Sequence, residues 1–85
     1  MRYYVYLLVS KNINKTISYV GYTNNLRKRL SEHNSSKGAK FTRGRIWRLA
    51  FSKMYFSRSK AMKEEYKLKK DYKLRNNIKK KFLFK

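Results

Sequence analysis

The sequence predicts a mixed α/β fold in which a β-hairpin, a short helix, a third strand and a longer helix follow one another. Near the N-terminus, apolar side chains recur with the period of two that is typical of strands, and further on they recur with the period of a helix. Each helical stretch begins near a serine or threonine that can cap its first turn. The 85 residues predict one domain over 1–85, with a modest core.

The hairpin is predicted from two strands, over 2–10 and 16–22, which contain the β-branched and aromatic residues that strands favour. Residues 11–15 form the turn between them. In the first strand, one face carries Tyr3, Val5, Leu7 and Val9, and the other carries Tyr4, Tyr6 and Leu8. If the two sequence numbers of each cross-strand pair add up to an odd sum, Tyr6 and Tyr19 project from the same face of the hairpin.

After the hairpin, a helix is predicted over 24–33, with Thr23 as its N-cap. Its inward side is formed by Leu26 and Leu30, which are four residues apart and therefore lie on one face. The serine-rich and glycine-containing stretch over 34–38 is predicted to be a loop.

A third strand and a second helix complete the predicted elements. The strand covers 45–56, and its more apolar face carries Trp47, Leu49 and Phe51. The helix covers 60–75, with Ser59 as its N-cap. Its apolar stripe consists of Ala61, Met62, Leu68 and Tyr72. Glu65 projects into the middle of this stripe, whereas Glu64 projects toward its outer flank.

Glu65 is unusual because a carboxylate on a buried face costs several kcal/mol unless a cation or hydrogen-bond donors compensate it. A structural ion pair with one of the many lysines or arginines is one explanation, and a functional role is the other. The helix is predicted to end near Asn76 and Asn77. The core then covers about 3–70 and a basic tail about 76–85, whose end fits a short strand or a helical turn equally well.

The charge of the chain indicates a polyanionic partner. Lysine and arginine number 24 and aspartate and glutamate number 4, so the formal net charge is +20. Nucleic acid is the commonest such partner, and an anionic membrane surface is the other candidate. No run of about 18 apolar residues occurs, and the N-terminal stretch fits a strand better than a signal peptide. Since cysteine is also absent, we expect a cytoplasmic protein, with no obligate protein partner inferred.

The scarcity of acids limits the possible chemistry. The carboxylates are Glu32, Glu64, Glu65 and Asp71, which can hardly supply the clustered ligands of a two-metal phosphoryl-transfer site. A single histidine excludes a multi-histidine metal site within one chain, and the lack of cysteine excludes disulfides, thiolate–zinc sites and cysteine nucleophiles. Catalysis would have to use tyrosine, arginine, one histidine and one carboxylate.

Several residues of the hairpin and first helix could be functional, but each also has a simple structural explanation. These residues are Tyr6, Tyr19, Gly21, Arg29 and His33. The tyrosines could pack in the core, the glycine could close a strand, and the arginine could be a solvated charge. The histidine projects beside the inward side of its helix, with the arginine next to it, and could be an ordinary boundary residue.

The order of these residues along the chain resembles the GIY-YIG nuclease domain, and more closely its small standalone members. Four stretches carry the resemblance: YVYLLVS at 4–10, with Tyr4 in place of the first glycine of the name motif, YVGYTNNLRKRLSEHN at 19–34, GAKFTRGR at 38–45 and SKAMKEEYKLKK at 59–70. Together they cover about residues 3–70. The fold implied is α/β (α+β), with a small, three-stranded, mainly antiparallel sheet flanked by helices.

The resemblance also implies a chemistry, namely hydrolysis of a phosphodiester with one divalent ion, Mg²⁺ or Mn²⁺. Glu65 is the implied protein ligand of that ion, and Tyr6 or Tyr19 is the implied general base toward the attacking water. A tyrosine would need nearby positive charge to act at working pH. Arg29 would stabilise charge on the phosphate, and His33 would orient a tyrosine or relay a proton.

The nucleic acid itself is expected to lie against Gly21, which would let the backbone pass close to the substrate, and against Lys40, Thr42 and Arg43, which would contact phosphates. The expected function is therefore a DNA endonuclease with a role in repair or recombination. One alternative is a non-catalytic nucleic-acid-binding module with a degenerate nuclease site, although such a module has little use for a carboxylate facing the site. Another is a membrane-surface protein anchored by its basic, aromatic tail over 78–85.

Overall fold

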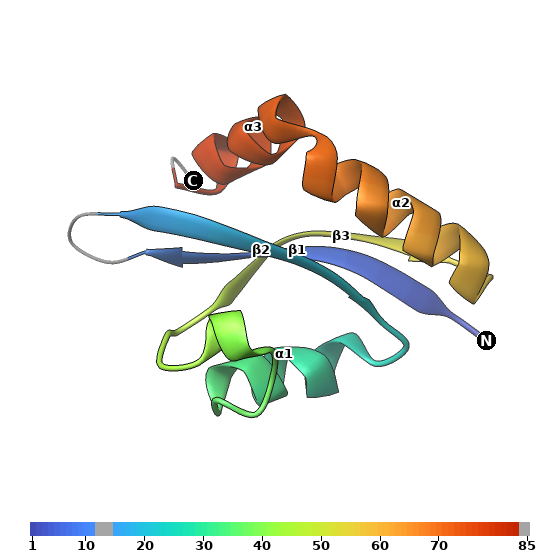
Figure 1. The fold of residues 1–85 in the computed structure, drawn as a ribbon, viewed down its shortest axis with the longest axis horizontal. Coiled ribbons are helices and arrows are strands. Elements are labelled where there is room, and N and C mark those ends of the chain that lie inside the picture. Colours follow the sequence, from blue (N-terminus) through green and yellow to red (C-terminus); the bar gives the residue numbers. More distant parts are fainter. Residues whose placement is uncertain (12–14, 84–85) are drawn as a thin grey trace.

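The computed structural model describes residues 1–11 and 15–83. Residues 12–14 of the turn predicted over 11–15, and the last two residues of the tail, therefore lie outside the described residues. The elements follow in the order β1 (Tyr3–Lys11), β2 (Thr16–Thr23), α1 (Leu26–Asn34), the short 3-10 helix η1 (Lys40–Thr42), β3 (Arg48–Tyr55), α2 (Arg58–Lys70) and α3 (Tyr72–Leu83). The strands form an antiparallel sheet in the order β2-β1-β3. Figure 1 shows α1 on one face of this sheet and α2 and α3 on the other, which confirms the predicted α/β class.

The central strand β1 is buried on both faces because helices cover both. Its alternation sorts the core into two clusters. Val5, Leu7 and Val9 pack with Ala61 and Leu68 of α2, and Tyr6 and Leu8 pack with Trp47 and the partly buried leucines of α1. β1 pairs with β2 so that Tyr6 faces Gly21 and Leu8 faces Tyr19. The paired numbers add up to an odd sum, so Tyr6 and Tyr19 do project from the same face.

Both long helices begin at a cap other than the predicted one. Asn25, not Thr23, caps α1, because β2 runs through Thr23 and the Asn25 side chain accepts the N–H of Lys28 at 3.1 Å. Ser57, not Ser59, caps α2 and accepts the N–H of Lys60 at 3.0 Å. In each case the cap is the last residue with extended backbone, and a side chain further along or further back cannot reach the free N–H groups.

The predicted apolar face of the third strand is wrong. Phe51 pairs with Leu7, but Leu49 pairs with Leu8, so β3 contains one extra residue at this point, a β-bulge. The bulge turns Phe51 toward the α2 side of the sheet and leaves Leu49 in the cluster under α1. Trp47 belongs to that second cluster too, but it precedes the strand.

The helix predicted over 60–75 is in fact two helices. α2 ends at Lys70, and the Asp71 side chain accepts the N–H of Leu74 at 3.0 Å, which starts a new helix. α3 continues through both asparagines to Leu83, so the predicted end near Asn76 and Asn77 is wrong. The described part of the tail is helical because Ile78 and Phe82 pack against the sheet cluster.

The buried stripe of α2 is narrower than predicted. Ala61 and Leu68 are buried, whereas Met62 and Tyr72, at 47% and 67% exposure, face solvent. The Glu65 side chain is 16% exposed, against 24% for Glu64, so Glu65 is the more buried of the two. Among the described residues, no helix has the length and apolar character needed to cross a membrane.

Candidate active site

Tyr6 and His33 form the centre of the candidate site. Tyr6 extends from the central strand toward the edge strand β2, and its hydroxyl lies 3.0 Å from His33 Nε2. Gly21, directly opposite Tyr6 in β2, makes room for the ring, since a Cβ atom there would come within 2.6 Å of Tyr6 Cζ. Gly21 is itself buried. Its role is therefore to let the tyrosine reach the histidine, in place of the expected close approach to a substrate.

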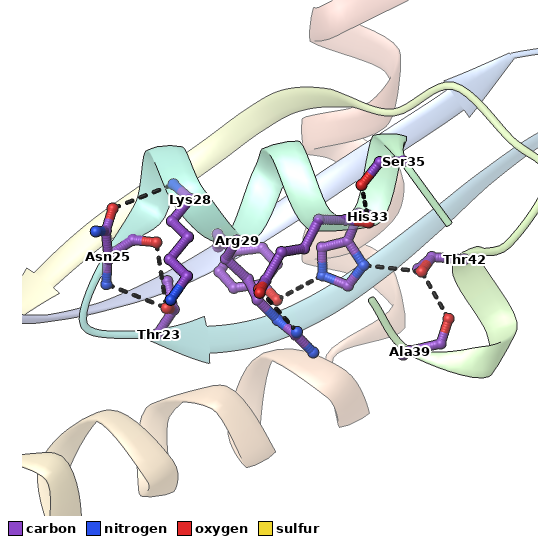
Figure 2. A network of polar contacts seen from close by, with 10 residues as sticks. Thr23, Asn25, Lys28, Arg29, His33, Ser35, Ala39 and Thr42 are labelled. Atoms are coloured by element: carbon purple, nitrogen blue, oxygen red, sulfur yellow. Dashed lines mark hydrogen bonds and ion pairs between the residues drawn. The ribbon is translucent and has the colours of Figure 1, made fainter. Parts of the chain in front are cut away.

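A chain of hydrogen bonds continues behind His33 (Figure 2). His33 Nδ1 lies 2.8 Å from the Thr42 hydroxyl, which in turn donates to the Ala39 carbonyl at 2.8 Å. Because the Thr42 proton is committed to Ala39, the hydroxyl oxygen accepts from His33 Nδ1–H. Nε2 of the neutral ring is then an acceptor, and Tyr6 donates to it. The network assigns one tautomer to the histidine and one direction to the Tyr6 hydroxyl.

This arrangement corrects the expected role of Thr42. The residue is fully buried, and both the proton and the oxygen of its hydroxyl are used inside the protein. No part of the side chain is available for a phosphate. Thr42 is thus a positioning residue for His33. Lys40 and Arg43, on either side of Thr42 and Phe41, are exposed, and their predicted contact with phosphates stays a prediction.

Arg29 acts on the same Tyr6 hydroxyl through its charge. Its positive charge favours the ionised form of that oxygen, and its guanidinium pairs with Glu32 Oε1 at 3.2 Å. Burial disfavours the charged guanidinium, but the contacts with Tyr6 and Glu32 outweigh this and raise the pKa of Arg29. The side chain is one-third exposed, so the cation faces both the buried tyrosine and the solvent.

The protonation states of Tyr6 and His33 follow from their burial. Burial raises the pKa of Tyr6 to about 12, although Arg29 acts in the opposite direction. Burial also lowers the pKa of His33, and the nearby charge of Arg29 lowers it further. In the free protein, the tyrosine therefore holds its proton and the histidine is neutral, as the hydrogen-bond network requires.

Tyr19 completes the group on this face of the sheet. Its ring centroid lies 5.1 Å from that of His33 and 6.1 Å from that of Phe41, with which it is nearly parallel. The structure therefore brings together four predicted residues, namely Tyr6, Tyr19, Arg29 and His33.

Glu65 belongs to α2, on the opposite face of the sheet from α1 (Figure 1). Burial above all raises the pKa of Tyr6, and the charge of Glu65 adds to this. Glu65 Oε1 pairs with Lys69 Nζ at 3.3 Å. Within residues 1–11 and 15–83, no three carboxylate or imidazole side chains cluster around one point. The Glu65 carboxylate is an oxygen ligand of the kind that a hard cation such as Mg²⁺ prefers.

Three residues that the sequence analysis did not assign to the site hold it in place. Asn34 accepts the backbone N–H of Trp47 at 2.6 Å and donates to its carbonyl at 3.0 Å. The Trp47 indole donates to the Thr42 carbonyl at 2.9 Å, so α1 and η1 are tied together behind the histidine. Gly38 lies against His33, where a Cβ atom would come within 2.9 Å of Cε1 and 3.0 Å of Cα. For Asn34, the signal in the sequence was its position next to His33.

The contact between Gly38 and His33 predicts the effect of a small substitution. Gly38→Ala should lower the free energy of unfolding by about 1–3 kcal/mol, because the added methyl group meets the His33 backbone as well as its ring. Urea denaturation measures this loss. Lys37→Ala, at the exposed neighbouring position, should stay within about 0.5 kcal/mol of the wild type. Equal stabilities for the two variants would contradict the close contact.

The lowered pKa of His33 predicts a pH dependence of stability. The unfolded chain, whose histidine titrates near about 6.5, binds a proton more readily than the folded chain does. The stabilisation from the neutral ring is therefore present above that pH and is lost as the pH falls below it. Denaturant unfolding at pH 7.5 and 5.5 should show a loss of stability in the wild type and a smaller loss in His33→Gln. The same loss in both proteins would contradict this assignment, since the chain has no other histidine.

The chain is similar in sequence to several known proteins. A UPF0213 protein of Oceanobacillus iheyensis is 44% identical over 69 residues, which are 80% of this chain and 77% of that protein. A UPF0213 protein of Bacillus licheniformis is 47% identical over 53 residues, but these cover 61% of this chain and only 55% of the relative. The solution NMR structure of a UPF0213 protein from Bacillus halodurans is 40% identical, covers 81% of this chain and 71% of that one, and has a TM-score of 0.48. Residues 2–79 match the family described as the GIY-YIG catalytic domain, and the chain therefore belongs to the GIY-YIG family.

Proposed function

We propose that the protein is a metal-dependent endonuclease that hydrolyses phosphodiester bonds in DNA. The observation that carries the proposal is the hydrogen-bond chain from Ala39 through Thr42 and His33 to Tyr6, with the charge of Arg29 acting on the same tyrosine oxygen. A buried tyrosine needs only one partner to satisfy its hydroxyl. Here a cation faces the oxygen while a neutral imidazole faces the proton, which is the arrangement that a tyrosine needs in order to act as a base.

The steps follow from these contacts. A phosphate of the substrate attracts the Arg29 guanidinium, which neutralises charge that develops on the phosphate and uncovers the Tyr6 hydroxyl. As Tyr6 takes a proton from the attacking water, it passes its own proton to His33 Nε2. Thr42 and Ala39 hold the histidine in the tautomer that can accept this proton. The water oxygen attacks phosphorus, and the leaving oxygen departs with the bonding electron pair and takes a proton from solvent.

Glu65 is the residue that would hold the metal ion. A divalent ion, Mg²⁺ or Mn²⁺, neutralises phosphate charge and lowers the barrier to attack when it is bound. Lys69 pairs with Glu65 Oε1 in the free protein, so a cation held by this carboxylate would compete with the lysine. The lysine is half exposed and can then turn toward a phosphate.

The charge of the molecule supports nucleic acid as the substrate and predicts how salt affects binding. With roughly five phosphate contacts, log K for duplex DNA should fall with log salt at a slope of about −4 to −5, because each contact releases a counterion. Fluorescence anisotropy of labelled DNA at several salt concentrations measures the slope. A slope near zero would remove nucleic acid as the partner of this protein, whose net charge is +20.

A cleavage panel tests the activity itself. Duplex, flap, branched and single-stranded DNA and an RNA strand are each incubated with Mg²⁺, with Mn²⁺ and with chelator, beside the variant Glu65→Ala. Cleavage that requires both the metal and Glu65 is the expected result, and preference for flap or branched DNA would support the role in repair or recombination. Tight binding without cleavage of any substrate would instead favour the nucleic-acid-binding module.

A further inference from the structure

A groove crosses the edge strand next to the candidate active site. It is lined by Ser18, Tyr19, Val20, Phe41, Lys69 and Arg75. Phe41 belongs to η1, on the face of the sheet that carries α1, whereas the two cations belong to α2 and α3 on the other face (Figure 1). The groove therefore passes over the outer edge of β2, and it adjoins the site through Tyr19, whose ring also contacts His33.

One wall of the groove presents an exposed aromatic ring. Phe41 is 58% exposed. It lies nearly parallel to Tyr19, at an angle of 21°, and its ring centroid is 6.3 Å from that of Trp47. These two contacts hold the ring in one orientation while much of its surface faces solvent. A fixed, exposed aromatic ring beside a cationic surface is the usual platform on which an unpaired base stacks.

The opposite wall is cationic. Lys69 Nζ is bound to Glu65, and its side chain is half exposed. The Arg75 guanidinium lies 5.6 Å from the ring centroid of Tyr72, and its Nε atom is buried without a hydrogen-bond partner among the described residues. Arg75 lines the groove, and phosphate is the acceptor that a guanidinium binds best.

We propose that this groove binds one unpaired nucleotide next to the scissile phosphodiester, with its base stacked on Phe41 and its phosphate bound by Lys69 and Arg75. The inference rests on the proposed function, which places the reacting phosphate at Tyr6 and Arg29. A base within continuous duplex reaches Phe41 only by leaving its stack, which costs a few kcal/mol. The substrate class is therefore DNA that is single-stranded at the cleavage point, either as a free strand or as a flap.

The test measures stacking and affinity without cleavage. The wild-type protein, in chelator, is titrated with a single-stranded oligonucleotide that carries the fluorescent base 2-aminopurine, and separately with the matching duplex. Stacking on Phe41 should change the fluorescence of the single strand. In Phe41→Leu this change should disappear and single-strand affinity should fall about tenfold, while duplex affinity changes less than about twofold.

The variant Phe41→Leu and a second variant, Arg75→Gln, each have a matched control. Leucine keeps an apolar side chain against Trp47, and circular dichroism checks that the fold is retained. Phe56→Leu removes an aromatic ring that is 74% exposed but lies outside the groove, and it should behave as the wild type. Arg75→Gln should reduce the steepness of the single-strand salt slope by about 0.7, whereas Lys73→Gln, at an exposed position of the same helix, should not.

The outcomes separate this inference from the proposed function. An unchanged 2-aminopurine signal in Phe41→Leu, or equal losses on single strand and duplex, would overturn the nucleotide groove. The expected loss in Phe41→Leu together with no cleavage of any substrate would support the groove and overturn the endonuclease. Cleavage that depends on Glu65 but not on Phe41 would support the endonuclease and overturn the nucleotide groove.

Discussion

Glu65→Gln should lower the rate of metal-dependent cleavage at least about a thousandfold, the largest effect expected of any single substitution. The amide keeps the shape of the side chain but removes the charge that would hold the cation, and a metal at a reacting phosphate supplies several kcal/mol of the barrier reduction. DNA binding should be unchanged or slightly tighter, because the substitution removes a negative charge from a basic surface. Single-turnover cleavage and fluorescence anisotropy measure the two effects separately.

Glu64→Gln is the matched control for that experiment. The two carboxylates are neighbours in α2, but Glu64 lies between Lys67 and Lys60, at 3.2 and 3.7 Å, on the β3 side of the helix. Lys67 above all holds the pKa of Glu64 below its usual range. Its loss should change cleavage less than about threefold, in line with a surface ion pair. If the two variants cleave at the same rate, Glu65 is not the metal ligand.

Tyr6→Phe is expected to have the second-largest effect, a loss of about 10²- to 10⁴-fold in the cleavage rate, which is the usual contribution of a general base. Phenylalanine fills the same space between Gly21 and His33 but can neither take a proton from water nor donate one to Nε2. The rate should be measured at saturating substrate, where affinity no longer contributes. Circular dichroism and urea denaturation establish that the variant is folded.

Tyr19→Phe decides between the two tyrosines. The Tyr19 ring packs against His33 and Phe41, and phenylalanine preserves both of these ring contacts. If Tyr6 is the base, Tyr19→Phe should retain at least about one-tenth of the wild-type rate. A large loss in Tyr19→Phe with little change in Tyr6→Phe would exchange their roles, and the hydrogen-bond chain behind Tyr6 would then be structural.

Properties that depend on local pattern could be predicted from the sequence. The alternation in residues 2–10 predicted a strand and its two faces, and an odd register sum was enough to bring Tyr6 and Tyr19 to one face. The period of the first helix placed His33 beside its inward leucines, and that of the second distinguished Glu65 from Glu64. The excess of basic residues also predicts a polyanionic partner without reference to the fold, and this stays a prediction.

Only the tertiary structure decided features that depend on contacts between elements. The bulge in β3 separates Leu49 from Phe51, although the alternation alone predicted one face for both. The Asp71 cap ends α2 where the helical pattern continues without interruption. The direction of Thr42 is the clearest case at the site, since its place among basic residues predicted a phosphate contact and its burial instead gives the hydroxyl to His33.

The physical reason is the same in each case. Periodicity describes which side chains share a face of one element, but the partner of a polar group depends on what the rest of the chain brings near it. Gly21 and Gly38 show this most directly, because their function is to leave space for side chains that are 15 and 5 residues away in the sequence, Tyr6 and His33. The residue types of this site were therefore determined by the sequence, whereas the proton direction from Tyr6 to His33 required the folded sheet.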